Sequence, residues 1–189
     1  MPSKLSTLSL IERYQKNILR VVRQLKYCPI REWAIDLAFF INGIPVATVE
    51  LKTDFTQSVD DAIHQYKVDR LPVDPKSKRK EPLLTFKRGA VVHFAMSDSS
   101  IYMTTELKGD NTFFLPFNKG NNGHAGNAVR KDGEYPVAYF WEEVCTYDNW
   151  LRIFHSFVYV EKKETQDKYG QLKTKETQIF RKRIINPTF

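Results

Sequence analysis

Hydrophobic residues recur along the chain with two different spacings. Over residues 9–27 they return every three or four positions, which predicts an amphipathic helix that ends before Pro29. The runs AIDLAFFI and IPVATVELK instead alternate residue by residue around Asn42-Gly43, and this pattern predicts a β-hairpin. After the hairpin, Ser58 is a potential amino-terminal cap for a helix over QSVDDAIHQYKVDR.

Strand-like patterns continue in the second half of the chain. GAVVHFAMS and SSIYMTTEL predict two strands around a turn, TFFLPF predicts another, and NWLRIFHSFVYVE has helical spacing. The proline-rich and basic stretch 71–80 and the glycine-rich stretch 116–136 predict irregular loops. We therefore expect an α/β (α+β) fold in which helices flank a central mixed sheet, with residues 1–160 as one domain and 161–189 as a basic linker.

Composition narrows the class of protein. The 189 residues are 42% apolar, which is enough for one domain with its own core, and the net charge of +7 allows a polyanionic partner. The two cysteines, Cys28 and Cys145, lie far apart and do not indicate a disulfide framework or a zinc site. Because no apolar run approaches ~20 residues, we expect a cytoplasmic protein with no membrane segment.

The predicted hairpin brings acidic residues together. Burying the alternating sets Ile35, Leu37, Phe39, Ile41 and Ala47, Val49, Leu51 on one face requires Phe39 opposite Ala47 and Leu37 opposite Val49. This register places Asp36 across from Glu50, with Lys52 on the same solvated face as Glu50. It also requires a three-residue or bulged connection, helped by Pro45, because a strict two-residue turn would pair Ile35 with Glu50.

Two facing carboxylates repel unless a cation lies between them. Mg²⁺ prefers carboxylate oxygens, so Asp36 and Glu50 are the predicted metal ligands. Lys52 could orient or deprotonate the attacking water and stabilise the charge on a phosphate. The alternative is that these residues are only solubilising charges, and for an arbitrary match to this short pattern that alternative is favoured.

The residues resemble the PD-(D/E)xK nuclease superfamily, and more closely the amino-terminal nuclease domain of the R (restriction and translocation) subunit of type I restriction enzymes. The segments that carry the resemblance are IDLAFFINGIPVATVELK, DAIHQYKVDR, FKRGAVVHFAMS, YMTTEL and FLPFNKGNNGHAGN. The resemblance implies a restriction-endonuclease-like fold, with Asp36, Glu50 and Lys52 at metal-binding and catalytic positions. Ile35 stands where the superfamily motif has proline. In the family's glutamine-tyrosine motif Gln65 fits the glutamine, but Asp69 occupies the tyrosine's place and Tyr66 lies beside Gln65.

The resemblance also implies a larger assembly. It predicts a Mg²⁺-dependent endonuclease that acts on double-stranded DNA and leaves a 5′-phosphate, with methyltransferase and specificity subunits as partners. The full subunit would carry an ATP-driven motor, but no G-x-x-x-x-G-K-[ST] motif occurs here, so we expect no ATP hydrolysis by these residues. The basic tail would then connect to that motor, and the isolated chain could be inactive.

Two other functions are compatible with the sequence. The first is a non-catalytic DNA-binding or assembly module with a nuclease fold, and the second is a stand-alone repair or junction-resolving nuclease. Residues 66–90 carry eight basic and three acidic side chains, which suits phosphate contacts or simply a solvated loop. Weaker candidates for a role are Glu12, Arg23, Gln24, His64 and the loop Gly120–Gly126, each with a surface or structural role as the alternative.

Overall fold

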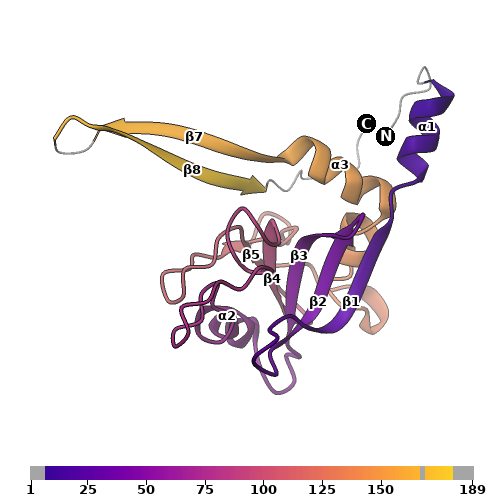
Figure 1. Ribbon diagram of the computed structural model, residues 1–189. Helices are drawn as coiled ribbons and strands as arrows, with labels where there is room; N and C mark the ends of the chain where they lie inside the picture. The colour runs from indigo at the N-terminus through magenta and orange to yellow at the C-terminus, as the bar shows by residue number, and fades with distance from the viewer. Residues whose placement is uncertain (1–6, 167–168, 181–189) are drawn as a thin grey trace.

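A six-stranded sheet forms the centre of the protein in the computed structural model, which describes residues 7–166 and 169–180 (Figure 1). The strand order is β1-β2-β3-β4-β5-β6, and a separate two-stranded sheet pairs β7 with β8. Only β3 and β4 run parallel; the other neighbours are antiparallel. The predicted α+β fold with a central mixed sheet is therefore confirmed.

The elements follow one another along the chain with short helices between strands. Their bounds are α1 Leu8–Gln15, β1 Leu19–Lys26, β2 Ala34–Ile41, β3 Ile44–Leu51, α2 Val59–Val68, β4 Val92–Met96, β5 Ile101–Thr104, β6 Leu115–Pro116, the 3₁₀ turn η1 Lys131–Gly133, the π-helical turn η2 Phe140–Val144, α3 Tyr147–Phe157, β7 Val158–Gln166 and β8 Leu172–Phe180. The strand predicted for TFFLPF is reduced to two residues. The predicted glycine-rich loop is present.

The β2–β3 hairpin has the predicted register. Leu37 pairs with Val49 and Phe39 with Ala47, and the register shifts beyond Phe39, where Phe40 pairs with Pro45. The turn itself has two residues, Asn42-Gly43, both with positive φ, as this turn type requires. The predicted bulge is thus confirmed, and it lies within β3 rather than in the turn.

The sheet is buried on both faces. On one face, Phe39, Val49 and Phe94 pack with η2, α3 and the end of β8. On the other face, Ala38 and Ala95 pack against Ala62 and Tyr66 of α2. Two expectations for the first face were wrong: Ile35 is buried with the second cluster, and Leu51, at the end of β3, is 39% exposed.

The amino-terminal segment corrects the predicted helix over residues 9–27. Helix α1 ends at Gln15, and the edge strand β1 pairs with the full length of β2. Asn42 accepts a hydrogen bond from the Ile18 amide and donates one to Asn17, which fixes the start of the strand. In β1 every third residue is half-buried, and hydrophobic residues at this spacing also occur on one side of a helix, so the sequence pattern predicts a helix there.

The carboxyl-terminal segment is not an unstructured linker over its described part. Residues 158–166 and 172–180 form the β7–β8 hairpin, which extends away from the central sheet (Figure 1). β8 ends at Phe180, which is buried against Phe94, Phe117 and Phe154. The helix predicted over NWLRIFHSFVYVE likewise stops at Phe157. Its last residues belong to β7, where β-branched side chains and cross-strand pairing favour a strand. The predicted connection of residues 161–189 to a motor stays a prediction, and residues 167–168 and 181–189 of this segment lie outside the described residues.

Within residues 7–166 and 169–180, none of the helices combines the length and hydropathy needed to cross a bilayer.

Candidate active site on β2, β3 and α2

Asp36 lies on β2 at the end of the sheet where β1 and β3 flank it. Its Oδ1 accepts a hydrogen bond of 2.7 Å from Gln24 Nε2, and its Oδ2 accepts one of 2.8 Å from the backbone amide of Leu51. Since Leu51 directly follows Glu50, the second bond ties Asp36 to the part of β3 that carries the other acid. The two predicted ligands are therefore neighbours, as the register argument required.

Glu50 is completely buried and forms an ion pair. Arg70, which follows α2, donates from Nε to Glu50 Oε1 over 2.5 Å, and its own side chain is 10% exposed. Burial raises the pKa of the Glu50 carboxyl to about 8; Arg70 opposes this rise and the charge of Asp36 adds to it. The nearby Asp36 therefore raises the pKa of the Glu50 carboxyl, and the nearby Arg70 lowers it.

The environment of Glu50 corrects one sequence expectation. Glu50 is covered by α2 and the residues that follow it rather than open to solvent, whereas Asp36 is only half-buried. The reading of these acids as solubilising surface charges is therefore wrong for Glu50. Burying a carboxylate is costly unless charge and hydrogen bonds compensate it, so this position has a structural or chemical role.

The two carboxylates suit a divalent metal ion. Glu50 Oε2 is buried without a hydrogen-bond partner among the described residues, beside a second carboxylate. An unpaired buried oxygen next to another acid is the donor set that a hard cation prefers. No group of three or more Asp, Glu, His or Cys side chains with metal-binding geometry occurs in the described part of the chain, so the protein offers two carboxylates.

The other two predicted catalytic residues, Lys52 and Gln65, lie on different elements. Lys52 is the first residue after β3; its backbone amide bonds to Met96, while its half-buried ammonium has no recorded partner within the described residues. Gln65 lies on α2, one turn from Ala62, and its buried Oε1 also lacks a partner there. The catalytic roles of both remain predictions.

Arg70 is the site residue that sequence reasoning missed. From sequence, Arg70 is only one of the basic side chains of residues 66–90. Ala62, Tyr66 and Arg70 are spaced four residues apart, and this spacing places them on the side of α2 that faces the sheet. The helix begins as predicted: Ser58 and Asp61 form a capping box with the backbone.

Tyr66 is buried in the core beside the sheet and is not exposed at the candidate site. Its hydroxyl lies 2.8 Å from Thr48 Oγ1, which in turn lies 2.7 Å from His93 Nδ1, and all three residues are buried. Burial lowers the pKa of His93 to about 3, so its imidazole is neutral at physiological pH. His64, by contrast, is exposed on α2.

A cleft of about 430 Å³ opens beside Asp36. It is lined by Arg23, Gln24, Asp36, Leu37 and Leu51, so two of the weaker sequence candidates flank the predicted metal ligand. Glu12 is exposed on α1, which leads into the opposite end of β1, away from Gln24 (Figure 1). The structure does not bring Glu12 to this site.

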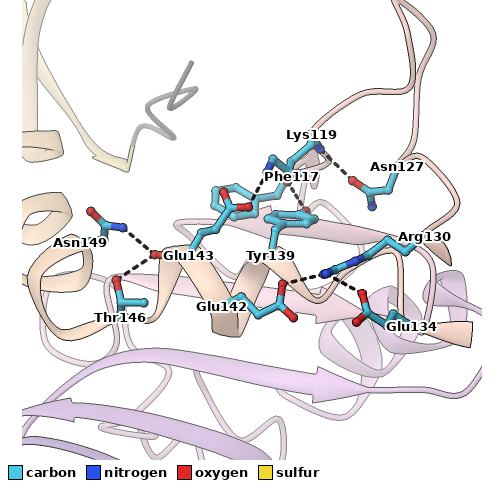
Figure 2. Close-up of polar contacts among 10 residues, drawn as sticks. All are labelled: Phe117, Lys119, Asn127, Arg130, Glu134, Tyr139, Glu142, Glu143, Thr146 and Asn149. Atoms are coloured by element: carbon cyan, nitrogen blue, oxygen red, sulfur yellow. Dashed lines mark hydrogen bonds and ion pairs between the residues drawn. The ribbon is translucent and has the colours of Figure 1, made fainter. Parts of the chain in front are cut away.

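The glycine-rich loop is anchored elsewhere, over η2. Lys119 Nζ lies 2.6 Å from Glu143, and Arg130 lies 2.6 Å from both Glu134 and Glu142. Figure 2 marks these ion pairs with dashed lines. Tyr139 donates to the Phe117 carbonyl beneath them. Lys119 and Arg130 are thus paired with acids of the same chain, which favours a structural role for the loop over a phosphate-binding one.

The basic segment around residues 75–80 is exposed, as expected. Asp74 accepts bonds from the amides of Lys76 and Ser77 and pairs with Arg31, which fixes the preceding turn. The backbone bonds from Ser77, together with Arg31, lower the pKa of Asp74. Not all cations of residues 66–90 are free, because Arg70 is buried with Glu50 and Lys87 pairs with Glu176.

Fold and site together define an α+β domain with two neighbouring acids on adjacent strands, a buried Glu50 and a half-buried Asp36, which is the arrangement of a restriction-endonuclease-like protein. Residues 6–112, more than half of the chain, match the family described as type I restriction enzyme R protein N terminus. The chain belongs to this family. No curated protein and no solved structure is significantly similar to it.

Proposed function

We propose that the chain is a Mg²⁺-dependent endonuclease domain that hydrolyses phosphodiester bonds of double-stranded DNA in restriction of foreign DNA. The observation that carries the proposal is the juxtaposition of Asp36 with a fully buried Glu50 whose Oε2 has no partner in the described protein. Membership of the R-subunit family supports a restriction context.

Asp36 and Glu50 would hold the metal ion. When bound, Mg²⁺ supplies positive charge at the phosphate and lowers the pKa of water. Gln24 and the Leu51 amide keep the Asp36 carboxylate in place, and Arg70 does the same for Glu50. These contacts leave the remaining lone pairs of the acids available to a cation.

Lys52 and Gln65 complete the proposed chemistry. Lys52, at the end of β3, would orient the attacking water and stabilise charge on the phosphate, while Gln65 would position water or the DNA backbone. The water oxygen bonds to phosphorus and the bond from phosphorus to the 3′ oxygen breaks. The products are a 3′-hydroxyl, which takes up a proton, and a 5′-phosphate.

The proposed partners are double-stranded DNA and the methyltransferase and specificity subunits of a type I restriction complex. The exposed basic segment around residues 75–80 supports contacts with DNA phosphates, which are independent of sequence and sensitive to salt. Target recognition would belong to another subunit. Translocation would require a motor outside these residues.

Calorimetric titration with Mn²⁺ tests the proposal without requiring the chain to cut alone. The wild type, Asp36→Asn and Glu50→Gln are compared, with far-UV circular dichroism as the control for folding. We expect binding by the wild type and its loss in both folded variants. Supercoiled plasmid incubated with Mg²⁺ provides the direct test of cleavage, with Lys52→Ala expected to bind Mn²⁺ but not to cut.

The alternative is a non-catalytic DNA-binding or assembly module, supported by the exposed basic segment. It predicts salt-sensitive DNA binding that is unchanged by Asp36→Asn and Glu50→Gln, together with no Mn²⁺ binding by the wild type. Such a result would overturn the endonuclease proposal.

A further inference from the structure

Strand β1 is irregular at the residue that faces the predicted metal ligand. Its register with β2 passes from Arg23–Leu37 to Leu25–Ile35, and Gln24 between them has a φ of +48°. This is the left-handed region, which costs a residue with a Cβ of order 1 kcal/mol and is favoured by glycine and, more weakly, by asparagine. A glutamine inside a strand is an unusual residue to adopt it.

The irregularity at Gln24 coincides with a change of face: Leu25 and Ile35 pack in the cluster that contains α2, whereas Leu19 and Leu37 pack in the other cluster. Gln24 is exposed and belongs to neither hydrophobic cluster. The left-handed Asn42, by comparison, occupies a hairpin turn that requires a positive φ. A positive φ in the middle of a strand is costly for glutamine, and backbone strain of this kind clusters at functional sites.

The side chain of Gln24 shows what the conformation achieves. Its amide nitrogen lies 2.7 Å from Asp36 Oδ1, on the wall of the 430 Å³ cleft that Asp36 also lines. With the Leu51 amide on Oδ2, both oxygens of Asp36 are held from the protein side. An aspartate held at both oxygens cannot rotate away from Glu50.

We propose that Gln24 is a positioning residue for Asp36, and that β1 accepts a strained backbone there so that the amide can fix this carboxylate for a divalent cation. The inference rests on the proposed function and extends it to a residue outside the acidic pair. Residues that orient metal ligands in this way commonly change metal affinity 10–100-fold when they are replaced.

Two pairs of variants separate the side chain from the backbone. Gln24→Ala and Gln24→Gly both remove the amide, but only glycine relieves the positive φ. Val21→Ala and Val21→Gly are the matched controls, because Val21 is exposed on the same strand, has an ordinary φ and pairs with Phe39.

The readouts are the dissociation constant for Mn²⁺ by calorimetry and the melting temperature without metal. We expect Gln24→Ala and Gln24→Gly to bind Mn²⁺ at least about tenfold more weakly than the wild type, and both Val21 variants to bind normally. Gln24→Gly should melt about 2–4 °C above Gln24→Ala, whereas Val21→Gly should melt below Val21→Ala.

The experiments distinguish failure of the Gln24 inference from failure of the proposed function. If the wild type binds Mn²⁺ and the Gln24 variants bind equally well, the positioning role is wrong while the proposed function stands. If Gln24→Gly melts below Gln24→Ala, as at position 21, the backbone is not strained and the inference is also overturned. A wild type that binds no Mn²⁺, like Asp36→Asn, would remove the proposed function and this inference together.

Discussion

Removing the positive charge beside Glu50 is expected to destabilise the protein strongly. In Arg70→Met the carboxyl of Glu50 loses its 2.5 Å partner while it stays fully buried, and the Arg70 side chain is itself only 10% exposed. Solvent therefore screens this pair little. Breaking a buried ion pair by removing one partner costs about 3–5 kcal/mol, mainly because the remaining charge is left without compensation.

The assay is urea unfolding at pH 9, which is above the pKa of about 8 of the Glu50 carboxyl, so that this group is ionised in the folded protein. Unfolding is followed by circular dichroism. Glu50→Gln/Arg70→Met removes both charges and should recover a large part of the loss seen in Arg70→Met, so that the two substitutions are strongly non-additive. Lys108→Met is the control, because its ion pair with Glu106 is about half exposed on the lysine side. We expect a change of less than about 1 kcal/mol there. A similarly small effect of Arg70→Met would refute the argument that Glu50 depends on this cation.

Three further predictions concern stability. Folded His93 has a pKa of about 3, whereas an unfolded histidine is protonated near pH 6.5, so between these pH values this residue should lower the unfolding free energy by about 1.4 kcal/mol for each unit of falling pH. In urea titrations at pH 7, 6 and 5, the unfolding free energy of His93→Gln should depend less steeply on pH than that of the wild type. Equal slopes would contradict the assignment. Phe180→Ala should cost about 3–5 kcal/mol in urea unfolding because Phe180 is buried in the core, whereas a loss below 1 kcal/mol would mean that β8 does not contribute to it. Ser58→Ala should cost about 1 kcal/mol through loss of the α2 cap, measured by thermal melting, and an unchanged melting temperature would exclude the capping role.

The hairpin was predictable from sequence because its constraints are local. Alternation fixed Leu37 against Val49 and Phe39 against Ala47, and this register alone places Asp36 near Glu50. Strand β1 was not predictable in the same way. Its half-buried residues are spaced by three around the irregular Gln24, and that spacing is shared by helices.

Other features depend on contacts between distant segments. The pairing of Arg70 with Glu50 and the burial of Phe180 arise from tertiary packing, so composition indicated a surface charge and a linker instead. The covering of Glu50 by α2 was missed for the same reason. The sequence pattern therefore located the acidic pair but not its environment.

The most direct test is anomalous diffraction from crystals of the protein soaked in Mn²⁺. The account predicts a peak between the carboxylates of Asp36 and Glu50, absent in crystals of Asp36→Asn. Two results would contradict it. One is that the two carboxylates lie together but show no peak at a Mn²⁺ concentration that saturates wild-type binding in solution; the other is a peak at a different place in the protein.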